Sequence, residues 1–355
     1  MDAQLFVLPF LHLGVGRLAA DLMLAVRARG ARVVAITCGW TGDLGDDPEL
    51  VAECRAAGIA FEHADVFSRD PEVMRQTARI VAGCCARFRP AMAHAFTAVA
   101  AAAVRQCPVV ASAVGWSPNK PEWQRTMDVE ILARCAGVTA VSEAVAAELA
   151  NAGLVRRPTI IRNGVPMRAP RHPRQSIETI GVVAHLIERK GVDVALRAVS
   201  LLPVGTFSRL RIAGTGESAR GLETLAASLS LPCPVDWCGH VSTDEFFRTI
   251  DVLVVPSRAD ALPLVLLNGM AAALPIVASR TGGIPEALRD DEGWLVPPGD
   301  ERALAQALLD VAANAAEGHA RGGRARVHAD RVFSAERMIG EYLECYEIVT
   351  EARAR

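Results

Sequence analysis

The sequence predicts an α/β protein made of two doubly wound parallel-sheet domains. Short runs rich in Val and Ile alternate with amphipathic helical segments, the alternation stops in a proline- and arginine-rich stretch at residues 166–176, and then it starts again. Continuous apolar strands between such helices are typical of parallel sheets covered on both faces. A chain of 355 residues is also long enough to form two cores.

Each half of the chain supplies its own set of strand candidates. The first set lies at residues 5–10, 32–37, 59–63, 92–94, 109–113, 138–141 and 159–161, with a helical pattern at 17–29 that Gly30 ends. The second set lies at 179–183, 210–213, 235–237, 252–255 and 276–278. We expect a first domain at 1–168, a linker at 169–177, a second domain at 178–332 and a closing helix at 333–355.

Composition narrows the class of function. The net charge is −2 and the basic residues are spread along the chain, which argues against a nucleic-acid partner. Nine scattered cysteines form no C-x-x-C pair and no metal-ligand spacing, so we expect reduced thiols, no metal and no cofactor. Without a long apolar run or a leader-like N-terminus, a cytoplasmic protein is expected. Peripheral contact with a membrane and the oligomeric state stay open.

The most informative segment runs from Pro256 to Ala271. It reads as the end of a buried strand, a short loop with Asp260, and an apolar helix that starts near Pro263 and carries Asn268 about a turn later. This order directs both side chains and the helix N-terminus to one place beyond the carboxyl end of a strand. Open α/β sheets bind anionic ligands there.

Two further loops follow strands of the second domain. His185, Arg189 and Lys190 precede Gly191 and a helix, a pattern that can hold a diphosphate by charge and hydrogen bonds. The alternative is a solvated surface loop. Gly282-Gly283 before Pro285 suits a backbone that approaches a ligand closely, although turn geometry alone could also explain it.

The first domain has a glycine motif after its first strand. Gly14-Val15-Gly16-x-x-Ala19 formally matches the dinucleotide fingerprint. That function also needs an acidic residue at the end of the second strand, and this strand ends in Thr37-Cys38-Gly39-Trp40. We therefore favour a tight turn that lets a helix N-terminus approach a small ligand over a site for NAD.

Taken in order, these motifs resemble the retaining GT-B nucleotide-sugar glycosyltransferases, a family that includes bacterial mannosyl- and glucosyltransferases and sucrose-forming enzymes. The resemblance is carried by Lys190-Gly191, Ala213-Gly214-Thr-Gly216-Glu217, Gly239-His-Val241, Pro256-Ser257, the segment from Asp260 to Asn268, Gly282-Gly283-Ile-Pro-Glu286 and Val296-Pro-Pro-Gly-Asp300. It implies two Rossmann-like domains facing a cleft, with the closing helix crossing back to the first domain.

The resemblance also implies roles for individual residues. Lys190 would pair with the donor diphosphate, Asp260 would contact the transferred sugar, and His94 would lie near the reacting sugar. The remaining donor-binding set would be Gly14, Gly16, His185, Arg189, Gly214, Val241, Leu264, Val265, Asn268, Gly282 and Gly283.

Three of these positions depart from the family pattern. Asp260 and Asn268 stand where the family usually has Glu, and His185 stands where it often has Arg. Asn268 lacks the charge-assisted hydrogen bond of a carboxylate, so nucleotide affinity is expected to fall about tenfold or more. These changes predict weaker donor binding or an unusual donor.

The expected function is transfer of a sugar from a nucleoside-diphosphate sugar, most simply a UDP-sugar, to an unidentified acceptor with retention and without a metal. The loop from Gly115 to Trp123 is the candidate acceptor site, through Trp116, Asn119, Lys120 and Trp123, although both tryptophans could simply anchor the loop. A GT-B-like scaffold or activator subunit, a nucleotide-sugar epimerase and an NAD-linked oxidoreductase are the alternatives. The small-molecule donor and acceptor are the expected partners.

Overall fold

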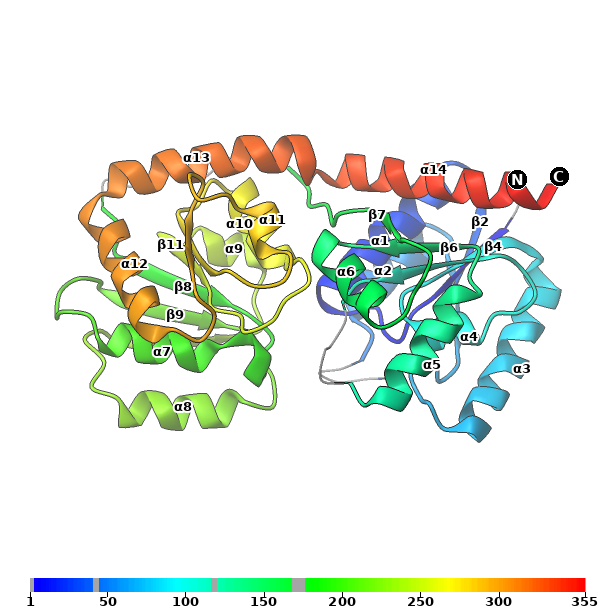
Figure 1. Cartoon of the computed structure of the whole chain (residues 1–355), viewed down its shortest axis with the longest axis horizontal. Helices are drawn as coiled ribbons and strands as arrows, with labels where there is room; N and C mark the ends of the chain where they lie inside the picture. The colour runs from blue at the N-terminus through cyan, green and yellow to red at the C-terminus, as the bar shows by residue number, and fades with distance from the viewer. Residues whose placement is uncertain (1–2, 41–44, 116–119, 168–175, 355) are drawn as a thin grey trace. The chain divides into compact units, whose positions relative to one another are not determined.

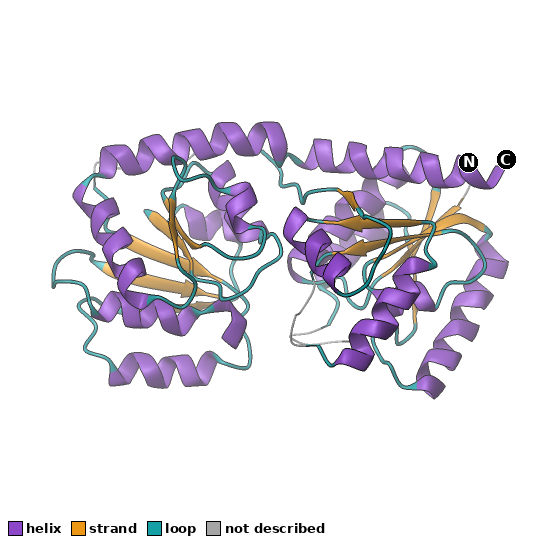
Figure 2. Ribbon diagram, in the orientation of Figure 1, coloured by secondary structure: helices purple, strands orange, loops and turns teal. Residues whose placement is uncertain are grey.

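The computed structural model describes residues 3–40, 45–115, 120–167 and 176–354. The chain divides into two compact units, one of Met1–Asn163 with Glu336–Arg355 and one of Gly164–Ala335. Each unit holds a parallel sheet with helices on both faces (Figure 2). The predicted fold class of two doubly wound, Rossmann-like domains is thereby confirmed. Most of the linker predicted at 169–177 lies outside the described residues and stays a prediction, as do the other domain limits.

In the first unit the described residues form a seven-stranded parallel sheet in the order β3-β2-β1-β4-β5-β6-β7. Its strands are β1 Ala3–Val7, β2 Arg32–Thr37, β3 Ala60–His63, β4 Pro90–Ala95, β5 Val109–Ala113, β6 Gly137–Ala140 and β7 Thr159–Ile160. The helices are α1 Leu13–Ala28, α2 Pro48–Ala56, α3 Pro71–Phe88, α4 Ala98–Ala102, α5 Glu122–Ala133, α6 Glu143–Asn151 and α14 Ala335–Ala354. Side chains of α1, α2 and α14 share one hydrophobic core with the sheet.

In the second unit the described residues form a six-stranded parallel sheet in the order β10-β9-β8-β11-β12-β13. Its strands are β8 Thr179–Val183, β9 Arg209–Ala213, β10 Val235–Gly239, β11 Val252–Val255, β12 Ile276–Ser279 and β13 Trp294–Val296. A 3-10 turn, Glu188–Lys190, precedes α7 Val192–Ser200, and the further helices are α8 Ala219–Ser228, α9 Thr243–Phe247, α10 Leu264–Ala271, α11 Ile284–Ala287, α12 Glu301–Ala313 and α13 Ala315–Val332.

The helices of the second unit form two layers around this sheet (Figure 1). One layer contains α7, which packs against both α8 and α12, and the other contains α10, which packs against α9 and α13. The sheet between them is almost fully buried at β11 and β12. Burial on both faces explains why these strands read as continuous apolar runs.

Two predicted elements differ from the structure, and one strand was missed, for identifiable reasons. The first strand ends at Val7 and not at Phe10, because Pro9 has no N–H to continue the ladder. The helix predicted from Arg17 already begins at Leu13, so the glycines at 14 and 16 lie in its first turn and not in a tight turn before it. The three-residue strand Trp294–Val296 was not predicted, because it is too short to show a period.

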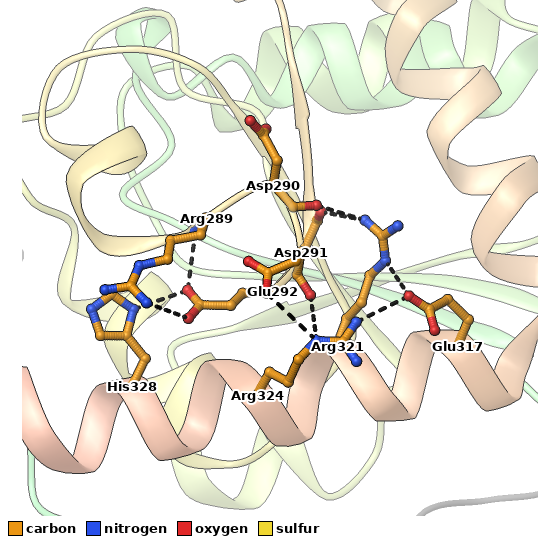
Figure 3. A network of polar contacts seen from close by, with 9 residues as sticks. Arg289, Asp290, Asp291, Glu292, Glu317, Arg321, Arg324 and His328 are labelled. Carbon is orange, nitrogen blue, oxygen red and sulfur yellow. Dashed lines mark hydrogen bonds and ion pairs between the residues drawn. The ribbon is translucent and has the colours of Figure 1, made fainter.

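Side chains of helix α13 form hydrogen bonds and ion pairs with the loop between α11 and β13 (Figure 3). The Arg321 guanidinium donates to the carbonyl oxygens of Asp290 and Gly293 at 2.9 and 2.8 Å. Nδ1 of the buried His328 lies 2.9 Å from a carboxylate oxygen of the buried Glu292. These contacts fix the segment that follows α11, and α11 itself begins directly after Gly282-Gly283.

Candidate active site

The candidate site lies at the carboxyl edge of the second sheet. Strand β8 pairs with β9 on one side and with β11 on the other, so the strand order reverses at β8. The loops that follow these strands therefore emerge on opposite sides of a topological switch point, where doubly wound sheets bind their ligands. The predicted motifs around Lys190, Gly214, Asp260 and Gly282 all occupy such loops.

Lys190, Asp260 and Ser257 form a polar cluster at this edge, which we call the donor cluster. The Lys190 Nζ donates to Asp260 Oδ2 at 2.5 Å, and the Ser257 hydroxyl donates to the same oxygen at 3.2 Å. The side chain of Lys190 is 15% exposed and that of Asp260 is 9% exposed. The structure thus brings together the two residues predicted to be catalytic in the second domain. Their roles stay predictions.

Arg189 adds a second positive charge beside the donor cluster. Arg189 lies 3.9 Å from Asp260 Oδ1, and its side chain is 55% exposed. Asp260 thus faces two cations, whereas the neighbouring Arg258 has its own carboxylate in Asp193, with both contacts at 2.7 Å. Burial lowers the pKa of Lys190, the Arg189 charge lowers it further, and Asp260 opposes both effects. Lys190 and Arg189 thus lie side by side at this edge, and their remaining N–H groups can bind an anion.

Three glycines bring the loops of the site into backbone contact. A Cβ at Gly191 would lie 2.1 Å from the Pro256 carbonyl oxygen, and one at Gly282 would lie 1.7 Å from that of Asp260. Gly214, predicted for donor binding, would place a Cβ 1.8 Å from the Ala184 carbonyl oxygen. All three have a positive φ. No side chain fits at these positions, so glycine sets the spacing between the loops.

Helix α10 presents unsatisfied backbone donors to this edge. Its N-cap is Pro263, which provides no side-chain cap. Among the described residues, the N–H groups of Leu264 and Val265 form no backbone hydrogen bond, and both residues are half-buried. Asn268 is half-buried one turn later, and its Nδ2 donates to the Leu264 carbonyl oxygen at 3.0 Å. The second N–H of this amide and its Oδ1 are left for a ligand.

The remaining predicted donor residues lie in nearby loops or in the first unit. His185 is half-buried in the loop after β8, and Val241 is half-buried after β10. Gly283 is buried at the N-cap of α11, and its N–H donates to the Asp260 carbonyl oxygen at 3.2 Å. In the first unit, Gly14 is half-buried and Gly16 is buried, with a Cβ on Gly16 falling 2.6 Å from the Leu11 carbonyl carbon. Close packing of α1 on Leu11 explains Gly16 without a ligand.

His94 occupies the core of the first unit. It is 1% exposed, and its ring nitrogens lie 2.6 Å from the hydroxyls of Tyr346 on α14 and Ser112 on β5. Ser112 also contacts the hydroxyls of Thr139 and Tyr342 at 2.7 and 3.0 Å. We call these five residues the tyrosine network. With both nitrogens bound inside the core, His94 does not have the exposure that contact with a sugar requires, and we do not carry its predicted catalytic role further.

The predicted acceptor loop is described only in part. Trp116 and Asn119 lie outside the described residues. Lys120 Nζ lies 2.8 Å from Asp128, a carboxylate that is 1% exposed and that also pairs with Arg69. Trp123 is 60% exposed on α5, in a shallow depression lined only by residues of that helix. Lys120 is therefore bound to a buried carboxylate, and Trp123 does not anchor the loop to the core.

Sequence reasoning did not assign a site role to Ser257, although its neighbour Asp260 stood out. Its position directly before the loop of Asp260 was the available signal. Across the described residues no group of three His, Cys, Asp or Glu side chains could hold a metal ion. Within the same residues, no helix is long and apolar enough to cross a membrane.

Two family models match the chain in succession. Residues 13–169 match the model described as Glycosyltransferase Family 4, and residues 177–314 match the one described as Glycosyl transferases group 1. The amylovoran biosynthesis glycosyltransferase AmsK of Erwinia amylovora is 34% identical over 146 residues, which are 38% of this chain and 36% of AmsK. The first relatives are matched over only 36–41% of their own length.

Solved structures share the fold along the whole chain. Anabaena HepE in complex with UDP and glucose has a TM-score of 0.84 at 17% identity, covering 98% of this chain and 100% of that one. Sucrose-phosphate synthase from Thermosynechococcus elongatus has a TM-score of 0.83 at 17% identity, covering 99% and 100%. With the family models matching both units and this shared architecture, the chain belongs to the GT-B glycosyltransferases.

Proposed function

We propose that this protein transfers a sugar from a nucleoside-diphosphate sugar to an acceptor. The observation that carries the proposal is the donor cluster at the β8–β11 switch point, where Lys190 and Arg189 share one carboxylate. The two neighbouring cations and the amides at the start of α10 that form no backbone hydrogen bond suit a diphosphate.

The chemistry follows from the charges of the reaction. Cleavage of a glycosyl phosphate builds negative charge on the departing diphosphate, and preorganised donors stabilise such charge most effectively. Lys190 has three N–H donors and uses one on Asp260, so the others can bind phosphate oxygens. When the diphosphate binds, Asp260 keeps the buried ammonium charged, because the carboxylate opposes the effect of burial on the pKa of Lys190.

Three finer features belong to the same proposal. We infer a UDP-sugar as donor, supported by the UDP that HepE binds in its solved complexes. We infer retention of configuration from the family resemblance, with the acceptor attacking on the leaving-group face. We also infer that side chains and amides, and not a metal ion, neutralise the diphosphate, since Lys190 and Arg189 already lie at the edge where it would bind. The free cysteines support a reducing compartment such as the cytoplasm.

A donor-hydrolysis screen tests the proposal. The protein is incubated with a panel of UDP- and GDP-sugars without acceptor, and released sugar is measured. In parallel, calorimetric titrations with UDP, GDP and NAD report binding. We expect UDP to bind and at least one UDP-sugar to be hydrolysed slowly. Binding of NAD with no binding of either nucleoside diphosphate would overturn the proposal in favour of an oxidoreductase.

One observation favours a second candidate, a GT-B-like subunit that binds a nucleotide without turning it over. Asn268 uses one amide N–H on its own helix, which leaves one N–H and a neutral acceptor where the family has a carboxylate. Weaker ribose binding would suit a scaffold or an activator. UDP binding without hydrolysis of any donor, and without transfer to any acceptor in a broad panel, would support this candidate over the enzyme.

A further inference from the structure

Three aromatic side chains cluster at the carboxyl edge of the first sheet. Phe10 follows β1, Trp40 follows β2 and Phe67 follows β3. Their ring centroids are 6.3 Å apart for Phe10 and Trp40, 6.2 Å for Phe10 and Phe67, and 5.8 Å for Trp40 and Phe67. Trp40 is 39% exposed and Phe67 is 47% exposed. We call this group the aromatic cluster. Exposed aromatic rings gathered at the ligand-binding edge of a parallel sheet point to a binding surface.

The loop that carries Phe67 is held firmly in place. Oδ1 of Asp65 accepts hydrogen bonds from the N–H groups of Phe67 and Ser68 at 3.0 and 2.8 Å. Farther along the loop, Arg69 forms two contacts of 3.1 and 3.2 Å with the buried carboxylate of Asp128. The chain thus keeps Phe67 at the surface by specific contacts, although burying the ring would be favourable.

The loops of Phe10 and Trp40 are tied together by a second carboxylate. Asp46 accepts from the Leu11 N–H and from the Thr37 hydroxyl, both at 2.6 Å. The Asp46 N–H donates to the Trp40 carbonyl oxygen at 3.0 Å. One acidic residue therefore connects the segments after β1 and β2. These contacts of Asp46 and Asp65 hold described residues next to the rings, and such preorganisation lowers the entropy lost when a ligand stacks on them.

The groups around the rings indicate the chemistry of the ligand. The ionisable groups near the rings include the carboxylates of Asp46 and Asp65 and the exposed imidazole of His63, whose Nδ1 lies 3.3 Å from the Thr37 hydroxyl. The cation that follows Phe67, Arg69, is paired with a buried carboxylate. None of the cation–π contacts in the described part of the chain involves these three rings. Carboxylates and imidazole bind hydroxyl groups, whereas an anionic membrane surface would need basic residues here.

We propose that the aromatic cluster binds the acceptor and that the acceptor is a neutral saccharide. One pyranose ring would stack its apolar face on Trp40 and contact Phe67 with its edge, because the two aromatic rings stand at 79° to each other. Its hydroxyls would reach the polar groups beside the rings. The role of this saccharide as the acceptor rests on the proposed function, whereas saccharide binding at the aromatic cluster does not. The site differs from the loop of Trp116 and Trp123 that the sequence suggested.

Saccharide binding by the full chain tests this inference. The protein is screened with saturating UDP on an array of neutral oligosaccharides, and the strongest oligosaccharide is then titrated. We expect Trp40→Ala and Phe67→Ala each to weaken binding at least about fivefold. Ile80→Ala, an exposed apolar side chain on α3 of the same unit, is the matched control and should bind like the wild type. Thermal unfolding of each variant verifies its fold.

Three outcomes would overturn the inference. In the first, the wild type binds no oligosaccharide. In the second, Trp123→Ala loses binding and the two cluster variants do not. In the third, the cluster variants lose binding to vesicles of phosphatidylethanolamine and phosphatidylglycerol but still bind saccharide. A separate UDP titration keeps the two proposals distinguishable. Saccharide binding without UDP binding would overturn only the proposed function, and UDP binding without saccharide binding would overturn only the saccharide site.

Discussion

The two units each contain a polar cluster against a parallel sheet, and the two clusters have opposite environments. The donor cluster lies beyond the strand ends, with the exposed Arg189 and the partly exposed Lys190 both beside Asp260. The tyrosine network lies beneath α14, where His94, Ser112 and Tyr346 are almost completely buried and bonded to one another. The same strand order thus supports a charged site in one unit and a neutral core network in the other.

The difference shows what separates a binding site from a structural network. A polar group whose hydrogen bonds are all satisfied in the core adds to specificity of packing and has nothing left for a ligand. A group at the strand ends that retains unused donors can bind one. On this criterion Lys190 remains a candidate functional residue, whereas the surroundings of His94 fit a structural role. The catalytic roles that the sequence suggested for both stay predictions.

The largest effect is expected for Lys190→Ala. Loss of the ammonium removes the main stabilisation of the departing diphosphate and should lower the rate of sugar release about a hundred- to a thousandfold. Sugar release from the donor found in the screen is the measurement. Arg220→Ala, on the exposed side of α8 in the same unit, is the control and should retain the wild-type rate. An unchanged rate in Lys190→Ala would break the comparison, because the donor cluster would then not be the diphosphate site.

Gly282→Ala should destabilise the second unit and weaken UDP binding. Gly282 has a φ of +53°, and its Cβ would lie 1.7 Å from the Asp260 carbonyl oxygen. Gly299 provides a matched control because its φ is +79° and a Cβ there meets nothing within 4 Å. We expect Gly299→Ala to cost about 1 kcal/mol of unfolding free energy and Gly282→Ala more than about 3 kcal/mol. Equal costs in urea denaturation would show that loop contact at Asp260 is unimportant.

We expect the burial of His94 to make the stability of the folded chain depend on pH, whether or not a sugar donor is bound. Burial lowers the pKa of His94 to about 3, below its ordinary 6.5. Below pH 6.5 the unfolded chain therefore takes up a proton that the folded chain refuses, so stability is present above 6.5 and is lost as the pH falls toward 3. Between pH 7 and pH 5 this group alone costs about 2 kcal/mol.

The matched variant for this effect is His94→Gln, which keeps hydrogen-bonding capacity but does not titrate. Its unfolding free energy, measured by urea denaturation at both pH values, should fall less with acid than that of the wild type. An identical fall in both proteins would mean that His94 titrates normally and is open to solvent, which would return it to the list of candidate catalytic residues.

Much of the fold could be predicted because buried parallel strands have a strong local signal. The strands at 32–37, 109–113, 179–183 and 252–255 were predicted with the observed bounds, as apolar runs between helices. The donor cluster was predictable for a similar reason, since Lys190 and Asp260 both follow strands whose carboxyl ends must meet at one edge. Features set by local sequence patterns were therefore predictable.

Features made by distant residues had no such signal. His94 contacts Tyr346, which lies 252 positions later, so its burial depends on where α14 packs. Phe10, Trp40 and Phe67 form no local motif, and only the pairing of β1 with β2 and of β2 with β3 brings their loops together. The available signal was that Trp40 and Phe67 follow predicted strands and that Phe10 ends one. The hydrogen bond from Asn268 to the Leu264 carbonyl oxygen could likewise not be predicted from the sequence, because it depends on the side-chain rotamer.

Asn268 gives the smallest expected effect and the sharpest test of how complete the donor site is. In the structure one N–H of its Nδ2 donates to the Leu264 carbonyl oxygen, so one N–H and a neutral oxygen, but no carboxylate, are left for a ribose hydroxyl. Asn268→Glu introduces a charged acceptor with a longer reach and should raise the affinity for UDP about tenfold. Asn268→Gln has the same added length without the charge, so it separates reach from charge. If calorimetry shows that both variants tighten UDP binding equally, length was the missing feature; if neither does, Asn268 does not contact the nucleotide, and the weaker donor binding expected from this departure has no basis at this position.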